Sequence, residues 1–179
     1  DVILGVIKGS AVYNDGKSIS PMAPRPLTQQ MVLRDAYQDA SMNPNSVDYL
    51  EAHGTGTALG DAIEAQTIIK TFGSKIIIGS VKPNIGHLLS GAGIAGLIKA
   101  LLIIKNKVIP PLINYETPRK ELKLEENGFI LNNQPIEIKK DKPITIGINA
   151  FGFGGTNAHI VLQEFKSKNN TINSFSQFI

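Results

Sequence analysis

The chain has 179 residues, of which 42% are hydrophobic and 18% are charged, and its formal net charge is +3. This length suffices for one domain with its own core, and the composition is that of a globular protein rather than a disordered or fibrous one. Nucleic-acid binding needs clustered basic residues with interleaved aromatic residues, but the densest basic stretch, 139–142, is interrupted by Asp141. The chain has no cysteine, which excludes disulfides and thiolate metal sites within it and favours a reducing, cytoplasmic compartment.

Apolar periodicity predicts alternating strands and helices along most of the chain. In chain order we predict a strand over 2–12, a helix over 27–40, a strand over 47–52, a helix over 61–72, a strand over 76–78 and a helix over 87–106. Short strands and loops over 108–113 and 129–138 precede a final pair of strands over 144–149 and 158–164. Asp61 is the predicted cap of its helix, with Glu64 completing a capping box. This order of elements predicts an α/β fold with a mixed sheet.

The predicted helix over 87–106 is apolar almost all round and carries glycines at positions 91, 93 and 96. Such a helix is buried on every side, with glycine where another backbone comes close. A chain with a single sheet covers it on one side only, so we expect something outside the chain to cover the rest. Ser90 and Lys99 interrupt the apolar stretch, which is shorter than the ~20 residues that span a bilayer, so we predict no membrane segment.

The ends of the chain differ in character. The N-terminus lacks the basic region of a signal peptide. Residues 1–165 form the predicted domain, and the polar, low-complexity residues 166–179 are predicted to be a linker or a disordered tail.

Two glycine patterns imitate nucleotide sites. The segment 54–60 (GTGTALG) lies between a predicted strand and a helix, but the next strand lacks the acid that a dinucleotide site needs. The segment 91–96 (GAGIAG) lies inside a predicted helix. Neither predicts a Rossmann cofactor.

The three histidines, His53, His87 and His159, have no metal-binding spacing, so we predict no metal site. His159 lies in the middle of a predicted strand, which favours a structural role. His53 and His87 each adjoin a glycine at a strand-to-helix turn, where functional side chains concentrate. The pattern alone leaves both a functional and a structural role open for this pair.

Three segments resemble motifs of β-ketoacyl synthases and occur in the order of that family. They are EAHGTGT over 51–57, SVKPNIGH over 80–87 and NAFGFGGTNAH over 149–159. The segment 9–16 also resembles the strand that opens the second half of these enzymes. The likeness covers about residues 2–165, and the chain resembles the C-terminal half of a ketosynthase of the polyketide or multidomain fatty-acid type.

This resemblance implies the second half of a thiolase-like fold, in which two similar halves stack as five alternating layers and one helix is fully buried. It also implies decarboxylative Claisen condensation of an acyl thioester with a malonyl or methylmalonyl group on an acyl carrier protein. No cofactor is bound directly, since the phosphopantetheine arm of the carrier presents the substrate. The implied partners are the carrier protein, the N-terminal half of the ketosynthase and the adjacent synthase domains.

The resemblance assigns catalytic roles to His53, His87 and Lys82. The two neutral imidazoles would donate hydrogen bonds to the enolate oxygen that forms on decarboxylation, as in an oxyanion hole. The ammonium group of Lys82 would keep them neutral, because a nearby positive charge disfavours protonation of imidazole.

Three further residues have implied roles in substrate binding. Thr55 and Thr57 would bind the amides of the phosphopantetheine arm. The backbone N–H of Phe153 would complete the oxyanion hole for the acyl-enzyme, while its ring would gate the acyl pocket.

The chain departs from the family pattern at two points. Many discrete fatty-acid synthases carry glutamate nine residues after the second histidine, whereas this chain has Gly96, as in multidomain polyketide synthases. The nucleophilic cysteine of the family lies in the first half, and no residue here replaces it. We therefore expect the isolated chain to expose an apolar face and to be inactive in condensation.

Three alternatives are consistent with parts of the pattern. The first is a non-elongating ketosynthase or chain-length factor that binds acyl chains, although such proteins often lose one histidine. The second is a thiolase or another acyl-CoA enzyme, whose C-terminal cysteine motif is absent here. The third is a piece that serves only in assembly.

Overall fold

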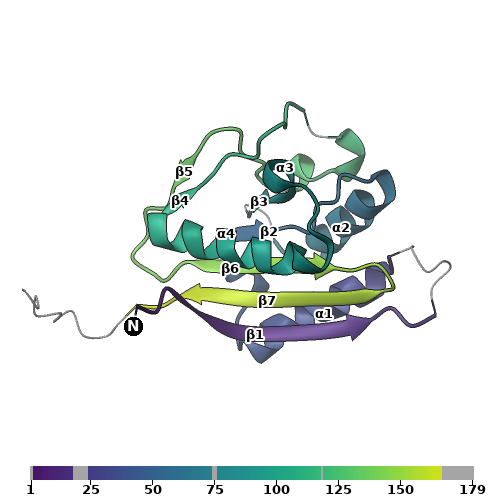
Figure 1. Cartoon of the computed structure of the whole chain (residues 1–179), viewed down its shortest axis with the longest axis horizontal. Helices are drawn as coiled ribbons and strands as arrows, with labels where there is room; N and C mark the ends of the chain where they lie inside the picture. The colour runs from purple at the N-terminus through teal and green to yellow at the C-terminus, as the bar shows by residue number, and fades with distance from the viewer. Residues whose placement is uncertain (1, 18–23, 74–75, 118, 167–179) are drawn as a thin grey trace, which may run out of the picture.

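A five-stranded mixed sheet forms the centre of the computed structural model, which describes residues 2–17, 24–73, 76–117 and 119–166 (Figure 1). Its strand order is β1-β7-β6-β2-β3. β7 pairs antiparallel with β1 and β6, whereas β2 pairs parallel with β6 and β3. The strands are β1 (Gly5–Asn14), β2 (Tyr49–Glu51), β3 (Ile77–Gly79), β6 (Thr145–Phe151) and β7 (Thr156–Glu164). The predicted α/β fold with a mixed sheet is therefore confirmed.

Helices cover both faces of this sheet. α1 (Pro26–Asp39) packs on β1, β7 and α2 (Ala58–Thr71), while α4 (Ala92–Asn106) lies on β6 on the opposite face (Figure 1). The short helix α3 (Lys82–Ile85) follows β3, and β4 (Val108–Ile109) pairs with β5 (Ile136–Glu137) in a separate two-stranded sheet.

Alternation along the strands divides the buried side chains between two cores, because successive side chains of a strand point to opposite faces. Leu50 and Val161 belong to the core beneath α1 and α2. Their neighbours Tyr49 and Leu162 belong to the core beneath α4. The central strands are therefore covered on both faces, which explains why their sequences are apolar without alternation.

Two predicted helix starts are wrong. α2 begins at Ala58 and is capped by Thr57, whose Oγ1 accepts from Gly60 N at 3.2 Å, so Asp61 is not its cap. α4 begins at Ala92 after the 3-10 turn Leu89–Gly91, which leaves His87 ahead of the helix. The sequence prediction also missed α3, although Pro83 in its first turn and a Gly cap (Gly86, φ 77°) are the usual signals of a short helix.

α4 is covered by this chain on one side only. A Cβ at Gly93 would lie 3.3 Å from Ala150 Cβ, so the helix packs closely on β6. On its outer side Ile94, Ile98 and Leu102 are 57%, 52% and 51% exposed. The helix that was predicted to be fully buried is therefore covered on one side only within this chain. The prediction that the chain exposes an apolar face is confirmed.

By length and composition alone, the stretch 89–106 is able to cross a membrane, and 28% of it is buried in the structure. A core helix in a water-soluble domain meets the same criterion. Here Lys99 of this helix forms an ion pair with buried Glu51 of β2 at 3.0 Å. An ion pair between a helix and a buried strand indicates that the helix packs on the sheet.

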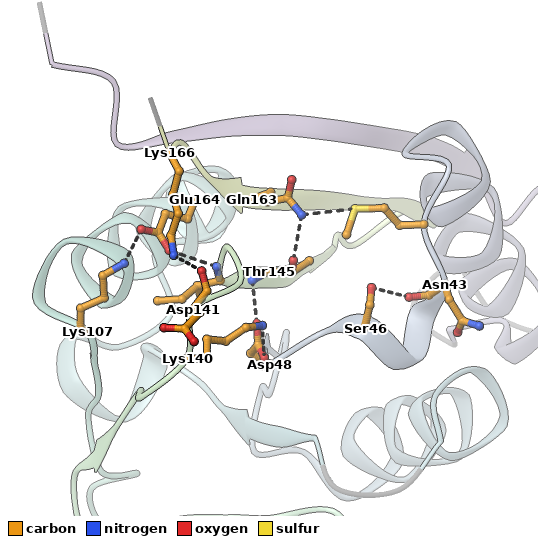
Figure 2. A network of polar contacts seen from close by, with 12 residues as sticks. Asn43, Ser46, Asp48, Lys107, Lys140, Asp141, Thr145, Gln163, Glu164 and Lys166 are labelled. Carbon is orange, nitrogen blue, oxygen red and sulfur yellow. Dashed lines mark hydrogen bonds and ion pairs between the residues drawn. The ribbon is translucent and has the colours of Figure 1, made fainter. Parts of the chain in front are cut away.

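A polar network holds the starting ends of β2 and β6 together (Figure 2). Asp48 Oδ2 accepts from the backbone N–H of Thr145 at 2.8 Å and from Lys140 Nζ at 2.7 Å. The backbone N–H of Asp48 donates to Thr145 O at 2.9 Å. These contacts fix the register of the two parallel strands, and so they determine which residues reach the opposite edge of the sheet.

Gly9 of β1 is required for the packing of α1. A Cβ at this position would lie 2.4 Å from both Ala36 O and Ala40 N, which are rigid backbone atoms. We predict that Gly9→Ala lowers the free energy of unfolding by about 3 kcal/mol, since α1 must move off the sheet. Urea denaturation of the protein that contains this chain measures the change. The exposed neighbour Ser10→Ala is the control, and equal stability of the two variants would contradict the packing described.

Candidate active site

The predicted site residues lie at the edge where three parallel strands end. His53 follows β2, Lys82 follows β3, and the turn 152–155 follows β6. Because β3, β2 and β6 run in the same direction, their carboxyl ends meet at one edge of the sheet. This edge is where α/β folds bind their ligands.

The structure brings His53 and His87 together from segments that are far apart in the sequence. Their ring centroids are 5.5 Å apart and the ring planes are nearly perpendicular, at 84°. The ring of buried Phe151, at the end of β6, lies 5.8 Å from that of His53. Three different strand ends therefore contribute to one aromatic cluster.

Hydrogen bonds at Nδ1 set the tautomer of both rings. Lys82 Nζ lies 3.4 Å from His53 Nδ1, and an ammonium group only donates. The backbone N–H of Leu89 donates to His87 Nδ1 at 3.0 Å. Since Nδ1 accepts in both rings, each neutral imidazole carries its proton on Nε2. The pair therefore offers two N–H donors of the same kind.

His53 is neutral at physiological pH. Burial lowers its pKa to about 3, with the positive charge of Lys82 and the neighbouring His87 acting in the same direction. Burial also lowers the pKa of Lys82, while the carboxylates of Glu64 and Glu51 oppose that shift. The ammonium group additionally donates to His53 O, which ties Lys82 to the backbone of the histidine turn.

A buried carboxylate that the sequence prediction placed in a capping box instead holds this turn. Glu64 of α2 accepts from the backbone N–H groups of His53 at 2.7 Å and Gly54 at 2.8 Å. The side chain of Asn149 donates to it at 2.9 Å. Burial raises the pKa of Glu64, and these hydrogen bonds counteract the rise. Its spacing from Asp61 was the only signal in the sequence, and that signal indicated the wrong partner.

A second buried carboxylate holds the segment that carries Lys82. Glu51 Oε1 accepts from the backbone N–H of Val81 at 2.5 Å, and its Oε2 accepts from Tyr49 Oη at 2.7 Å. A Cβ at Gly96 would lie 3.0 Å from Glu51 Cγ. Many discrete synthases carry glutamate at the position of Gly96. Here the glycine leaves room for the side chain of Glu51, which comes from β2.

The two predicted threonines lie on the turn that leads into α2. Thr55 Oγ1 and Thr57 Oγ1 are 3.0 Å apart. Arg119 crosses to this turn from a distant segment, with Nη2 2.7 Å from Asp61 Oδ2 and 3.4 Å from Thr57 O. Glu64 therefore holds the start of this turn and Arg119 its end. Thr57 remains exposed.

Phe153 is at the tip of the turn between β6 and β7, and it is 69% exposed. Gly154 and Gly155 follow it with φ values of 84° and 83°, a conformation that favours glycine. The ring is therefore presented outward, two residues from the Phe151 ring that contacts His53.

The described residues contain no group of three or more His, Cys, Asp or Glu that is placed to hold a metal ion. An apolar groove of about 400 Å³ lies between α3 and α4. Its lining includes Val81, Ile85, Leu88, Ile98 and Leu102.

Residues 4–116 match the family model of the β-ketoacyl synthase C-terminal domain, and residues 118–178 match that of the ketoacyl-synthetase C-terminal extension. The chain belongs to the β-ketoacyl synthase family. It is 40% identical over 172 residues to the polyketide synthase GfsA of Streptomyces halstedii, and this match covers 92% of the chain and 2% of that protein. It is also 40% identical over 177 residues to the highly reducing polyketide synthase 40 of Fusarium pseudograminearum, over 94% of the chain and 7% of that protein. The ketosynthase chain is thus similar to one section of much longer synthases.

Solved ketosynthases share the fold. The oxazolomycin ketosynthase domain of Streptomyces albus JA3453 superposes with a TM-score of 0.90 at 35% identity, over 96% of this chain and 32% of that one. The ketosynthase from module 6 of the bacillaene synthase of Bacillus subtilis 168 gives 0.88 at 37% identity, over 93% and 32%. The predicted thiolase-like fold is confirmed, and the chain spans about a third of the length of these ketosynthases.

We predict that Lys82→Met raises the pKa of His53 from about 3 towards 6.5, because a positive charge next to the imidazole is removed. The pKa should remain below 6.5, since burial is the larger cause. A ¹³C-histidine NMR titration of the ketosynthase measures it, with Lys105→Met on the exposed side of α4 as the control. An unchanged His53 pKa in Lys82→Met would show that the ammonium group does not act on the ring.

Proposed function

We propose that this chain supplies the decarboxylation half of a ketosynthase active site. The observation that carries the proposal is the pair His53 and His87, which are 5.5 Å apart between ring centroids and each protonated on Nε2. Two N–H donors that point at one oxygen stabilise the negative charge that develops on it. The substrate class that fits is a thioester whose carbonyl oxygen becomes an enolate.

The reaction has two parts. A cysteine, which this chain does not contain, holds the acyl group as a thioester and is supplied by the rest of the ketosynthase. A malonyl or methylmalonyl group on the carrier protein loses carbon dioxide, and the electron pair of the broken C–C bond passes into the enolate. The enolate carbon then attacks the acyl thioester, and the cysteine thiolate leaves. His53 and His87 donate to the thioester oxygen throughout and give up no proton.

Lys82 keeps His53 in the required state. Its ammonium group lies against His53 Nδ1, where it opposes protonation and fixes the proton on Nε2. A protonated imidazole would also stabilise the enolate, but it could transfer its proton to the carbanion and quench it before condensation. A His53 pKa near 3 prevents this loss.

The remaining site residues fit the handling of a carrier-bound substrate. Thr55 and Thr57 lie on the same turn as His53, with their hydroxyl oxygens 3.0 Å apart, and would bind the amides of the phosphopantetheine arm. The backbone N–H of Phe153 would donate to the acyl thioester oxygen, and its exposed ring would gate the acyl pocket. The carrier protein and the adjacent synthase domains are the partners that this arrangement needs. The cytoplasm is the compartment in which we expect them to meet.

The exposed face of α4 is the surface where the half of the ketosynthase that carries the cysteine would bind. Ile94, Ile98 and Leu102 are half exposed, and they border the apolar groove. A contiguous apolar surface of this kind is typical of an interface. We propose that the other half of the thiolase-like fold covers it and brings the nucleophile to the histidines. The isolated chain is accordingly inactive in condensation.

The test is malonyl-carrier decarboxylation by the complete ketosynthase. We predict that His53→Ala and His87→Ala each lower its rate about 10²–10³-fold, the usual cost of losing one oxyanion donor. Lys139→Ala, at an exposed ion pair, is the control. Acyl binding without decarboxylation or condensation in the unmodified protein would instead identify a non-elongating or chain-length-factor domain.

A further inference from the structure

The third histidine, His159, takes no part in the proposed reaction, yet it lies directly behind the site. It is fully buried in β7, opposite Asn149 of β6 in the strand register. Its Nδ1 is 2.7 Å from Asn149 Oδ1. A polar ring in this position has to be explained by the hydrogen bonds that it makes.

The direction of the hydrogen bonds follows from the groups involved. The amide nitrogen of Asn149 donates to Glu64 Oε1 at 2.9 Å, so its oxygen faces His159 and can only accept. His159 therefore donates from Nδ1. Burial lowers its pKa to about 3, so the ring is neutral and carries its proton there. This is the opposite tautomer to that of His53 and His87.

Glu64 extends the chain of hydrogen bonds to the active site, since it accepts from the backbone N–H groups of His53 and Gly54. We infer that His159 is a positioning residue. It fixes the Asn149 amide, which orients the Glu64 carboxylate, which holds the turn that carries His53. The consequence for catalysis rests on the proposed function, whereas the consequence for the turn does not.

His159, Asn149, Glu64 and the backbone N–H groups of His53 and Gly54 form a hydrogen-bonded relay. The loss of the His159 donor should weaken every hydrogen bond in it. Asn149 Oδ1 would be left buried without its donor, and a buried unsatisfied acceptor is costly. If the amide turned over to relieve this, its oxygen would face the Glu64 carboxylate, and the donor to Glu64 would be lost. In either case the hydrogen bonds to the His53 and Gly54 amides weaken.

Hydrogen exchange at single amides of the complete ketosynthase tests the relay without relying on activity. In His159→Leu we expect exchange at the His53 and Gly54 amides to become about tenfold faster, the effect of weakening one buried hydrogen bond. The Val81 amide should change little, because Glu51 holds it outside the relay. His159→Asn keeps an N–H donor near the place of Nδ1 and should restore slow exchange.

Tyr37→Phe is the matched control for the core. The Tyr37 ring lies 5.3 Å from that of His159, between centroids, but it belongs to α1 and is not part of the relay. This variant should leave exchange at His53 and Gly54 as it is in the unmodified protein. An equal increase at Val81 in His159→Leu, or no increase at His53 and Gly54, would overturn the inference.

Kinetics separate this inference from the proposed function. A positioning role predicts that His159→Leu lowers kcat for decarboxylation about tenfold with an unchanged KM for the malonyl carrier, and that His159→Asn recovers it. An unmodified protein that does not decarboxylate would refute the proposed function, and the exchange data would still decide the relay. Normal decarboxylation by His159→Leu would refute the role of His159 in catalysis and leave the proposed function standing.

Discussion

Backbone N–H groups at the end of a buried strand need acceptors, and here one carboxylate supplies them. Glu64 reaches from α2 to the amides of His53 and Gly54, while Lys82 donates to the carbonyl oxygen of the same histidine. His53 therefore cannot shift unless α2 and the segment after β3 shift with it. Burial opposes the charge on Glu64, and its three N–H donors and the nearby ammonium group offset that cost. The position of the imidazole depends on this carboxylate. Its tautomer and protonation state depend on burial and on the ammonium group of Lys82.

The rest of the fold brings these groups to a common edge and keeps them there. Parallel pairing of β2 with β3 and β6 places three strand ends together, and the Asp48 network at the opposite edge prevents the strands from slipping (Figure 2). A slip of one residue would turn every side chain of a strand to the other face. α4 closes one face of the sheet and leaves its outer side apolar. This outer side is the surface that we propose the remainder of the ketosynthase covers.

The sequence predicted the strands and the order of the longer helices, because the periodicity of a strand or helix is a local property. Motif resemblance also singled out the two histidines that the structure brings together, although their pattern alone left their role open. It did not predict how the site is held. Glu64 and Glu51 act through backbone groups that are distant in the sequence, and no local pattern distinguishes a buried carboxylate from a helix cap. The start of α4 was placed too early because the apolar pattern runs on through the 3-10 turn Leu89–Gly91. The role of Gly96 became clear only when the structure placed it against Glu51.

We propose that His53 and His87 donate together to one substrate oxygen. A crystal structure of the complete ketosynthase with a malonyl-thioester analogue that cannot decarboxylate, carried on a phosphopantetheine arm, tests it most directly. We expect the thioester oxygen to lie within hydrogen-bonding distance of Nε2 of both histidines. A thioester oxygen bound by only one of the rings, or held elsewhere with the rings contacting the carboxylate, would show that the two histidines do not act together on this oxygen.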